Sequence, residues 1–229
     1  MNRAHLIDCH VLTLPRFPAQ WVDEMRGDLD AEPVNQHWLP GIDGRLGEAR
    51  AAGYALGCAP FVSSADPDDR ITPGTFAALQ QALQDNPCAP FAWAGEQLVW
   101  EDLRELPPRF RHVWRGYSPM SHVYSGVHVH GVKLYRRALV MPLLDQMRQA
   151  GPCCEFLLDL AIIKPHTKPP RSSWPVHVPI VGRLWRQHGD NGSRDITVRD
   201  FDRAAQVLGF ESMAALRSEV ATAWHGTSV

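Results

Sequence analysis

Three carboxylates lie within four positions directly after an apolar segment of the chain. Asp66, Asp68 and Asp69 follow the run 61–65, which is typical of a buried strand. Carboxylates this close together repel one another, and a hard divalent cation that takes oxygen ligands removes that cost. Ligand sites in open α/β sheets also lie at the carboxyl ends of strands. The acidic cluster therefore predicts a metal site that holds a phosphorylated ligand.

A solvated turn is the alternative interpretation of the same residues. Asp-Pro sequences favour turns, and Asp69 and Thr72 are suitable caps for a helix that begins near Pro73. Two other segments favour the metal site. A helix-forming stretch over 44–57 carries Arg50 and ends at a glycine just before the strand. A polar segment over 184–193 carries Arg186 and a histidine.

Together these three segments resemble the nucleotide-diphospho-sugar glycosyltransferases of the GT-A fold, especially family 2. In that family a helix with Ala-Arg-Asn-x-Gly leads into a strand ending in Asp-x-Asp-Asp, and Arg-x-His-x-x-Asn-x-Ser closes the domain. The matching segments, over about residues 5–195, are Ala49-Arg50-Ala51-Ala52-Gly53, Asp66-Pro67-Asp68-Asp69 and Arg186-x-His188-x-x-Asn191-x-Ser193. Ala51 replaces the usual asparagine.

The resemblance implies a metal-dependent transfer of a sugar from a nucleotide-diphospho-sugar, a UDP-sugar being favoured, to an acceptor hydroxyl. Mn²⁺ or Mg²⁺ would stabilise the leaving diphosphate as a Lewis acid. The implied metal ligands are Asp66, Asp68 and His188. The residues implied to bind the nucleotide are Thr13, Pro15, Arg16, Asp43, Arg50, Asp66 and Arg186.

Several of these assignments have alternatives. The acidic residue that relatives carry at the end of the second strand is not evident here, and Asp43 is the candidate substitute, so the identity of the nucleobase stays open. Asp69 is either a ligand or a helix cap. Arg50 and Arg186 suit diphosphate oxygens because a guanidinium is a planar fork, but surface salt bridges are the alternative. His188 is one of eleven histidines and is favoured only by the resemblance.

Transfer with inversion needs a general base for the acceptor hydroxyl. Relatives carry an acidic residue at the start of a helix near the acceptor. Glu155 opens an apolar helix after the segment Arg136-Arg137, which matches a strand that lines the acceptor cleft in the family. Asp159 lies four residues later on the same helical face. We expect Glu155 to be the base and keep Asp159 as the second candidate.

His128 and His130 alternate within a stretch, 123–137, that is typical of a strand, so both would face one side. A zinc site needs further ligands, and none has suitable spacing. Aromatic residues in this half suit a sugar, a nucleobase or the core. They are Trp93, Trp100, Trp114, Tyr117 and Tyr124.

The elements that must position these residues alternate along the first half. Strands are expected over 5–14, 33–39 and 60–65, and helices over 19–29, 44–57 and 75–84. This order is typical of an α/β fold with a doubly wound, mostly parallel sheet, GT-A or Rossmann-like. The second half predicts strands over 91–100 and 123–137, and helices over 137–150 and 155–163.

The predicted organisation is a GT-A glycosyltransferase domain over 1–195 and a C-terminal helical segment over 196–229. Within the domain, residues 1–90 would bind the nucleotide and 91–195 the acceptor. Two amphipathic helices over 200–208 and 212–224 are expected to pack on the sheet, with a DNA-binding helix-turn-helix as the alternative.

Composition limits the classes of function. The net charge is −2 and no long basic run occurs, so the sequence indicates no nucleic-acid or anionic-membrane surface. Apolar stretches are too short for a transmembrane segment and the amino terminus lacks a signal-peptide pattern, so we expect a cytoplasmic protein.

Two rival functions stay open beside the glycosyltransferase. A nucleotidyltransferase shares the fold but normally has a glycine-rich phosphate loop, which the segment 12–16 lacks. A non-catalytic nucleotide- or sugar-binding module is favoured by Ala51 and disfavoured by the intact acidic cluster. The acceptor stays open among glycan, lipid-linked, protein and modified-base classes, as does the oligomeric state.

Overall fold

A computed structural model describes residues 5–107, 109, 111–112, 116–125, 128–189 and 196–225. The strands are β1 (Ile7–Thr13), β2 (Asn35–Pro40), β3 (Phe61–Ala65), β4 (Arg70–Ile71), β5 (Phe91–Trp100), β6 (Arg111–His112), β7 (Lys133–Arg136) and β8 (Val176–Gln187). The α-helices are α1 (Ala19–Asp30), α2 (Leu46–Tyr54), α3 (Thr75–Asp85), α4 (Pro119–Tyr124), α5 (Arg137–Val140), α6 (Leu144–Ala150), α7 (Cys154–Ile163), α8 (Val198–Val207) and α9 (Met213–His225).

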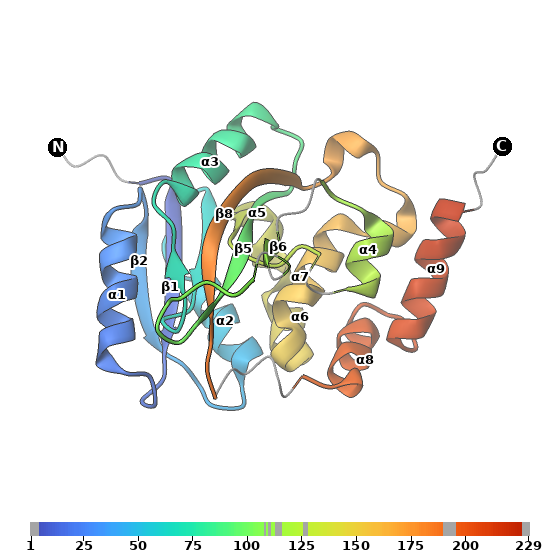
Figure 1. Cartoon of the computed structure of the whole chain (residues 1–229). Coiled ribbons are helices and arrows are strands. Elements are labelled where there is room, and N and C mark those ends of the chain that lie inside the picture. The colour runs from blue at the N-terminus through green and yellow to red at the C-terminus, as the bar shows by residue number, and fades with distance from the viewer. Residues whose placement is uncertain are drawn as a thin grey trace.

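The strands form one curved sheet in the order β2-β1-β3-β7-β5-β8-β4, with β6 paired to β5 (Figure 1). β1 is parallel to β2 and β3, and β5 is parallel to β8, whereas β7 is antiparallel to both β3 and β5. The five strands β1, β2, β3, β5 and β8 therefore run in the same direction. The predicted α/β fold is confirmed, with β7 reversed inside the sheet.

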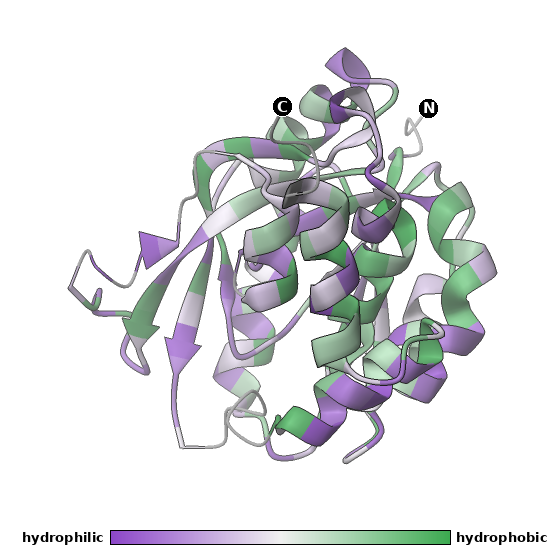
Figure 2. Ribbon diagram, turned by 90° about the vertical axis from the view of Figure 1, so that its right-hand side faces the viewer, coloured by the Kyte–Doolittle hydropathy of each residue, from purple (hydrophilic) through white to green (hydrophobic). Residues whose placement is uncertain are grey.

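Helices cover both faces of this sheet because its strands are apolar on both sides. On one face α1 and α3 contribute Met25, Leu29, Phe76, Leu79 and Leu83 to a buried cluster with β1, β3 and β5. On the other face α2, α6 and α7 pack on residues such as Trp93 and Tyr135. Seen from the side, the ribbons alternate between hydrophobic and hydrophilic residues, as helices with one buried face require (Figure 2).

The first half follows the predicted elements closely, but the second half differs in two places. The stretch 123–137 is a strand only over β7, because residues 119–124 form α4 and residues 128–129 form a turn. No strand was predicted over 176–187, where the long β8 pairs with β5. β8 has weak alternation of apolar residues, and its place in the sheet depends on pairing with β5.

We expected the C-terminal helices to pack on the sheet. They pack instead on the helical layer beside it. Val123 of α4 and Leu160 of α7 share an apolar cluster with Ala205 of α8 and Leu216 and Val220 of α9. Figure 1 shows α8 and α9 at the outer edge, beyond α4 and α6 from the sheet. The reason is that α4, α6 and α7 already cover this face.

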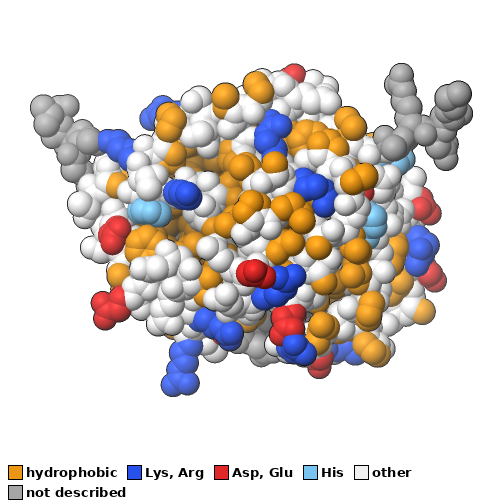
Figure 3. All heavy atoms as spheres, turned by 180° about the vertical axis from the view of Figure 1, so that it is seen from behind, with side chains coloured by type: hydrophobic (Ala, Val, Ile, Leu, Met, Phe, Trp, Pro, Cys, Tyr) orange, Lys and Arg blue, Asp and Glu red, His pale blue; other side chains and the backbone are white. Residues whose placement is uncertain are grey.

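Two surface properties follow from the described residues. No helix among them is long and apolar enough to cross a membrane. Seen from behind, Lys and Arg side chains are dispersed among Asp and Glu side chains, and neither sign gathers into one patch (Figure 3). This face therefore has no basic stripe of the kind that binds nucleic acids.

Candidate functional site

The carboxyl ends of β1, β2 and β3 bring the first group of predicted residues together. Thr13 pairs with Pro40 across β1 and β2, and Val11 pairs with Ala65 across β1 and β3. The loop after β3, with the acidic cluster, therefore lies beside the end of β1. This is the edge of an open α/β sheet at which ligands bind.

Arg50 lies at the centre of this edge, where its buried guanidinium joins two carboxylates. Its Nη2 donates to both carboxylate oxygens of Asp66, at 2.5 and 2.6 Å, and its Nε lies 3.3 Å from Oε1 of Glu155. The side chain is 3% exposed, and Nη1 has no hydrogen-bond partner among the described residues. Three residues from three predicted segments thus form one cluster.

The packing of α2 on β1 explains why Arg50 reaches this position. A Cβ added at Gly53 would lie 2.2 Å from the ring of His10 on β1, so only glycine lets the helix approach so closely. Ala51 is fully buried in the apolar cluster on this face. The small residues of the motif therefore fix the distance between α2 and the sheet, and Arg50 projects along its edge.

Glu155 lies in the first turn of α7 and faces the end of β3. Ser64 Oγ donates to its Oε1 at 2.7 Å, and the Tyr54 hydroxyl lies 3.4 Å from the same oxygen. Burial by itself raises the pKa of Glu155, but Arg50, Lys133 and the bond from Ser64 outweigh burial and lower the pKa to about 2. Glu155 is therefore ionised at neutral pH, as an acceptor of a proton must be.

The other carboxylates at this edge carry unbalanced negative charge. Burial raises the pKa of Asp66; Arg50 opposes this rise, and the charges of Asp68 and Glu155 add to it. Asp68 Oδ2 lies 3.1 Å from His188 Nε2. Two of the predicted metal ligands thus lie in contact. Among the described residues, no three His, Cys, Asp or Glu side chains are grouped so that they alone could hold a metal ion.

Asp69 is neither in this pair nor a cap of the following helix. Its Oδ1 accepts from the backbone N–H of Arg186 at 3.0 Å, and its Oδ2 lies 3.4 Å from Arg183 Nη1. The helix α3 is capped instead by Glu32, whose carboxylate accepts from the N–H groups of Gly74 and, at 2.9 Å, Phe76. Asp69 therefore ties the acidic loop to β8.

The predicted nucleotide-binding residues after β1 lie next to a small cavity. Arg16 Nη1 is 2.7 Å from Asp43, which is exposed beyond β2, and Thr13 Oγ1 donates to the Leu39 carbonyl at 3.1 Å. Pro15 is exposed in the adjoining turn. The cavity has a volume of about 220 Å³. It is lined by Arg16, Phe17, Pro18, Trp21, Glu101, His188 and Gly189.

Arg186 lies at this edge but turns away from the acidic cluster. Its Nη2 donates to Glu24 of α1 at 2.6 Å, and its guanidinium lies 4.7 Å from the ring of Trp21. Trp21 in turn contacts the ring of His188 at 4.8 Å. Arg186 therefore supports the wall of the small cavity, while its backbone holds Asp69.

The second base candidate, Asp159, is buried and bound by two side chains of β7. Lys133 Nζ donates to its Oδ2 at 2.5 Å and the Tyr135 hydroxyl to its Oδ1 at 2.7 Å, and the residue is 1% exposed. The alternating histidines do not share a face either. His128 Nε2 accepts from the Ser118 N–H at 2.9 Å, whereas His130 Nδ1 lies 2.8 Å from Glu96.

Some neighbours of the site could not be predicted. Ser64 and Tyr54 are neighbours of motif residues in the sequence, but no pattern predicts their contact with Glu155. No sequence pattern marks Glu24 or Arg183 as part of the site. Asp190, Asn191, Ser193 and Trp114 lie outside the described residues.

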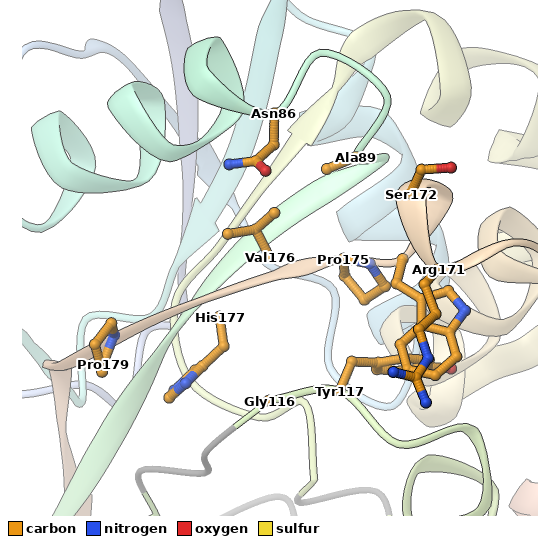
Figure 4. A pocket seen from close by; sticks show the side chains of 11 residues that line it. Asn86, Ala89, Gly116, Tyr117, Arg171, Ser172, Pro175, Val176, His177 and Pro179 are labelled. Carbon is orange, nitrogen blue, oxygen red and sulfur yellow. The ribbon is translucent and has the colours of Figure 1, made fainter.

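A larger cavity, of about 680 Å³, lies at the opposite end of β8 (Figure 4). It is lined by Asn86 after α3, Tyr117 before α4, Arg171, and Val176 and His177 at the start of β8. Tyr117 is one of the aromatic residues singled out in the sequence, but none of the predicted catalytic, nucleotide-binding or metal-binding residues lines this cavity. The acidic cluster and this cavity are therefore separate features.

Comparison with solved structures agrees with the predicted fold. The chain is similar to residues 1–349 of S. aureus TarS in complex with UDP-GlcNAc, with a TM-score of 0.59, 11% identity, and 97% of this chain and 73% of that chain covered. The UDP complex gives a TM-score of 0.59 and 12% identity over 94% and 69%. No protein-family model and no curated protein matches the sequence. The similarity establishes the GT-A fold.

Proposed function

We propose that this chain is a glycosyltransferase that transfers a sugar from a nucleotide-diphospho-sugar, a UDP-sugar, to an acceptor hydroxyl with inversion. The observation that carries the proposal is Arg50, buried between Asp66 and Glu155 at the strand ends of a GT-A fold. The complexes of the similar S. aureus protein with UDP-GlcNAc and UDP support a UDP-sugar as the donor.

Arg50 would bind the diphosphate. Its buried Nη1 has no partner among the described residues, and an N–H group of a guanidinium forms strong hydrogen bonds with phosphate oxygens. The cavity beside Trp21 and Arg16 would take part of the nucleoside, because it combines an aromatic wall with a cation. The contact between Arg16 and Asp43 places a carboxylate near the same cavity.

The donor set at Asp68 fits a divalent cation that is shared with the substrate. An aspartate oxygen and the His188 imidazole lie 3.1 Å apart, close enough to bind one Mn²⁺ or Mg²⁺, and diphosphate oxygens and water would complete the shell. Asp66 would act through water or bind the ribose. When bound, the cation would supply positive charge to the leaving diphosphate.

Glu155 would take the proton from the acceptor hydroxyl. In the free protein, Arg50 holds its pKa at about 2, which keeps it ionised but makes it a weak base. A bound diphosphate would partly neutralise the charge of Arg50, so Arg50 would lower the pKa of Glu155 less and Glu155 would become a stronger base. The proton would pass from the acceptor oxygen to Glu155 as that oxygen bonds to the sugar carbon and the nucleoside diphosphate leaves.

Calorimetric titration with UDP-, GDP- and CMP-sugars, each with and without Mn²⁺, tests the proposal. We expect a UDP-sugar to bind with Mn²⁺ and to release UDP slowly to water. Binding without any release of UDP would indicate the non-catalytic module. If no nucleotide or nucleotide sugar binds, the proposal is wrong.

A further inference from the structure

A buried carboxylate outside the proposed donor site holds two histidines. Glu96 of β5 is fully buried, and its Oε1 lies 2.8 Å from Nδ1 of His112 and 2.8 Å from Nδ1 of His130. Its Oε2 accepts from Nε of Arg183 at 3.1 Å and also from Nη2. Burial by itself raises the pKa of Glu96, but His130 and Arg183 lower it well below its usual range.

This arrangement fixes the chemistry of His130. An ionised carboxylate only accepts hydrogen bonds, so the contact with Glu96 places an N–H on Nδ1 of His130 and fixes the orientation of the ring, with Nε2 on its other side. Carboxylates orient catalytic and metal-binding histidines in this way. Arg183 supplies a positive charge beside Glu96, so the histidines are not required to balance it.

The backbone also holds His130 in place. The next residue, Gly131, has a φ of +96°, and a Cβ there would lie 2.3 Å from the Ala94 carbonyl oxygen of β5. The Ala94 N–H donates to the Val132 carbonyl at 2.9 Å. His130 is thus fixed just before β7, the strand between β3 and β5, yet its side chain remains 32% exposed.

The same histidine is joined to the acidic loop and to an aromatic ring. Arg183 donates to the same Glu96 carboxylate, and its Nη2 lies beside the imidazole, 2.9 Å from Nδ1 and 3.4 Å from Nε2. Its Nη1 lies 3.4 Å from Asp69. The half-buried indole of Trp185 lies 4.7 Å from the imidazole, at an interplanar angle of 64°. An aromatic surface, an oriented imidazole and a guanidinium therefore meet beside the acidic cluster.

We propose that His130 and Trp185 form the acceptor subsite, and that the acceptor is a saccharide. The C–H groups of a sugar ring pack on an indole, and its hydroxyls form hydrogen bonds with an oriented imidazole. His130 Nε2 forms a hydrogen bond with a hydroxyl of the acceptor, and Arg183 connects Glu96 with Asp69 of the loop that is proposed to hold the donor. The role as an acceptor site depends on the proposed transferase activity, whereas saccharide binding is tested independently of it.

The test uses the full chain and a panel of glucose, galactose, N-acetylglucosamine and their β-1,4-linked disaccharides, with uridine for comparison. Side-chain imidazole NMR spectra report the nitrogen signals of His130 during titration. We expect a saccharide to shift the Nε2 signal while Nδ1 stays protonated. If no saccharide in the panel shifts it, or if only uridine does, the saccharide subsite is wrong.

Two matched variants distinguish saccharide binding by His130 from a structural role of the Glu96 cluster. His130→Asn keeps a donor near Nδ1 for Glu96 but removes Nε2, and His112→Asn makes the same change at the other histidine on the same carboxylate oxygen. We expect His130→Asn to weaken saccharide binding about tenfold or more, the scale of one lost hydrogen bond. His112→Asn should retain it, and both should retain the melting temperature and UDP affinity. Equal losses in the two variants would make the Glu96 cluster structural.

The two proposals can fail separately. If UDP does not bind but His130→Asn selectively abolishes saccharide binding, the transferase proposal fails and the subsite stands. If UDP binds and turns over but His130→Asn binds saccharides as the wild type does, only the subsite fails.

Discussion

Nε of Arg50 in α2 lies 3.3 Å from Oε1 of Glu155 in α7, although the two residues come from opposite halves of the chain. The same guanidinium donates to Asp66, so it lies between a carboxylate of the acidic loop and the candidate base. This contact links the segment proposed to bind the donor to the residue proposed to activate the acceptor.

Arg50→Ala should weaken UDP binding by about 1.5–3 kcal/mol, the scale of a charged hydrogen bond, and leave uridine binding unchanged. Calorimetry measures both affinities. Because Arg50 lowers the pKa of Glu155 while burial raises it, the variant should also raise that pKa above about 2. An equal loss for UDP and uridine would mean that Arg50 is only structural.

Asp68→Asn should keep the fold but lose the part of the UDP affinity that depends on Mn²⁺. Removing one of three clustered charges relieves repulsion, and among the described residues Asp68 has no hydrogen-bond or ion-pair partner besides His188. Asp69→Asn is the matched control, because Asp69 supports the loop. It should lower the free energy of unfolding by about 1–3 kcal/mol, measured with urea. If Mn²⁺ still strengthens UDP binding to Asp68→Asn as in the wild type, Asp68 is not a ligand.

Glu155→Gln should retain UDP affinity while turnover falls by roughly 10²–10⁴-fold, the usual contribution of a general base. Asp159→Asn should act on stability instead, since it leaves the buried Lys133 without its charged partner. We expect a loss of about 3–5 kcal/mol in unfolding free energy. Release of UDP and urea unfolding measure the two effects. Loss of turnover in a folded Asp159→Asn protein with Glu155→Gln active would make Asp159 the base.

Stability should fall as the pH is lowered from about 6.5. Burial, with the charge of Arg50, lowers the pKa of His10 well below the usual histidine value of about 6.5, so below that pH the unfolded chain binds a proton that the folded protein does not. One such histidine contributes a slope of about 1.4 kcal/mol per pH unit. Unfolding of His10→Asn, measured with urea from pH 7 to 5, should show a smaller slope. Identical slopes would mean that His10 is protonated in the folded protein.

Gly53→Ala should destabilise the protein by about 1–3 kcal/mol, because the added Cβ would meet the His10 ring. UDP affinity should fall with it, since α2 carries Arg50. Gly27→Ala in α1 is the control: nothing lies within 4 Å of its added Cβ, and alanine favours a helix by about 0.5–1 kcal/mol. Melting temperatures of the two variants test both expectations. A Gly53→Ala protein as stable as the wild type would show that α2 can shift away from His10 without loss of stability.

Most of the first half could be predicted from the sequence alone. Apolar runs identify β1 and β3, and amphipathic spacing identifies α1 and α3, because these signals depend on neighbours a few residues away. The acidic cluster and Arg50 were predicted at strand ends, and the structure brings them together. Their location could be predicted because parallel strands align their carboxyl ends at one edge of the sheet.

The tertiary structure alone decided the roles of the residues that look alike in sequence. Asp69 and Asp68 are adjacent, yet one is bound by the backbone of β8 and the other contacts His188. Glu155 and Asp159 share a helix face, but Lys133 and Tyr135 bind only the second. Such contacts depend on how β7 and β8 enter the sheet. That pairing joins distant segments by non-local hydrogen bonds and packing, which no local spacing encodes.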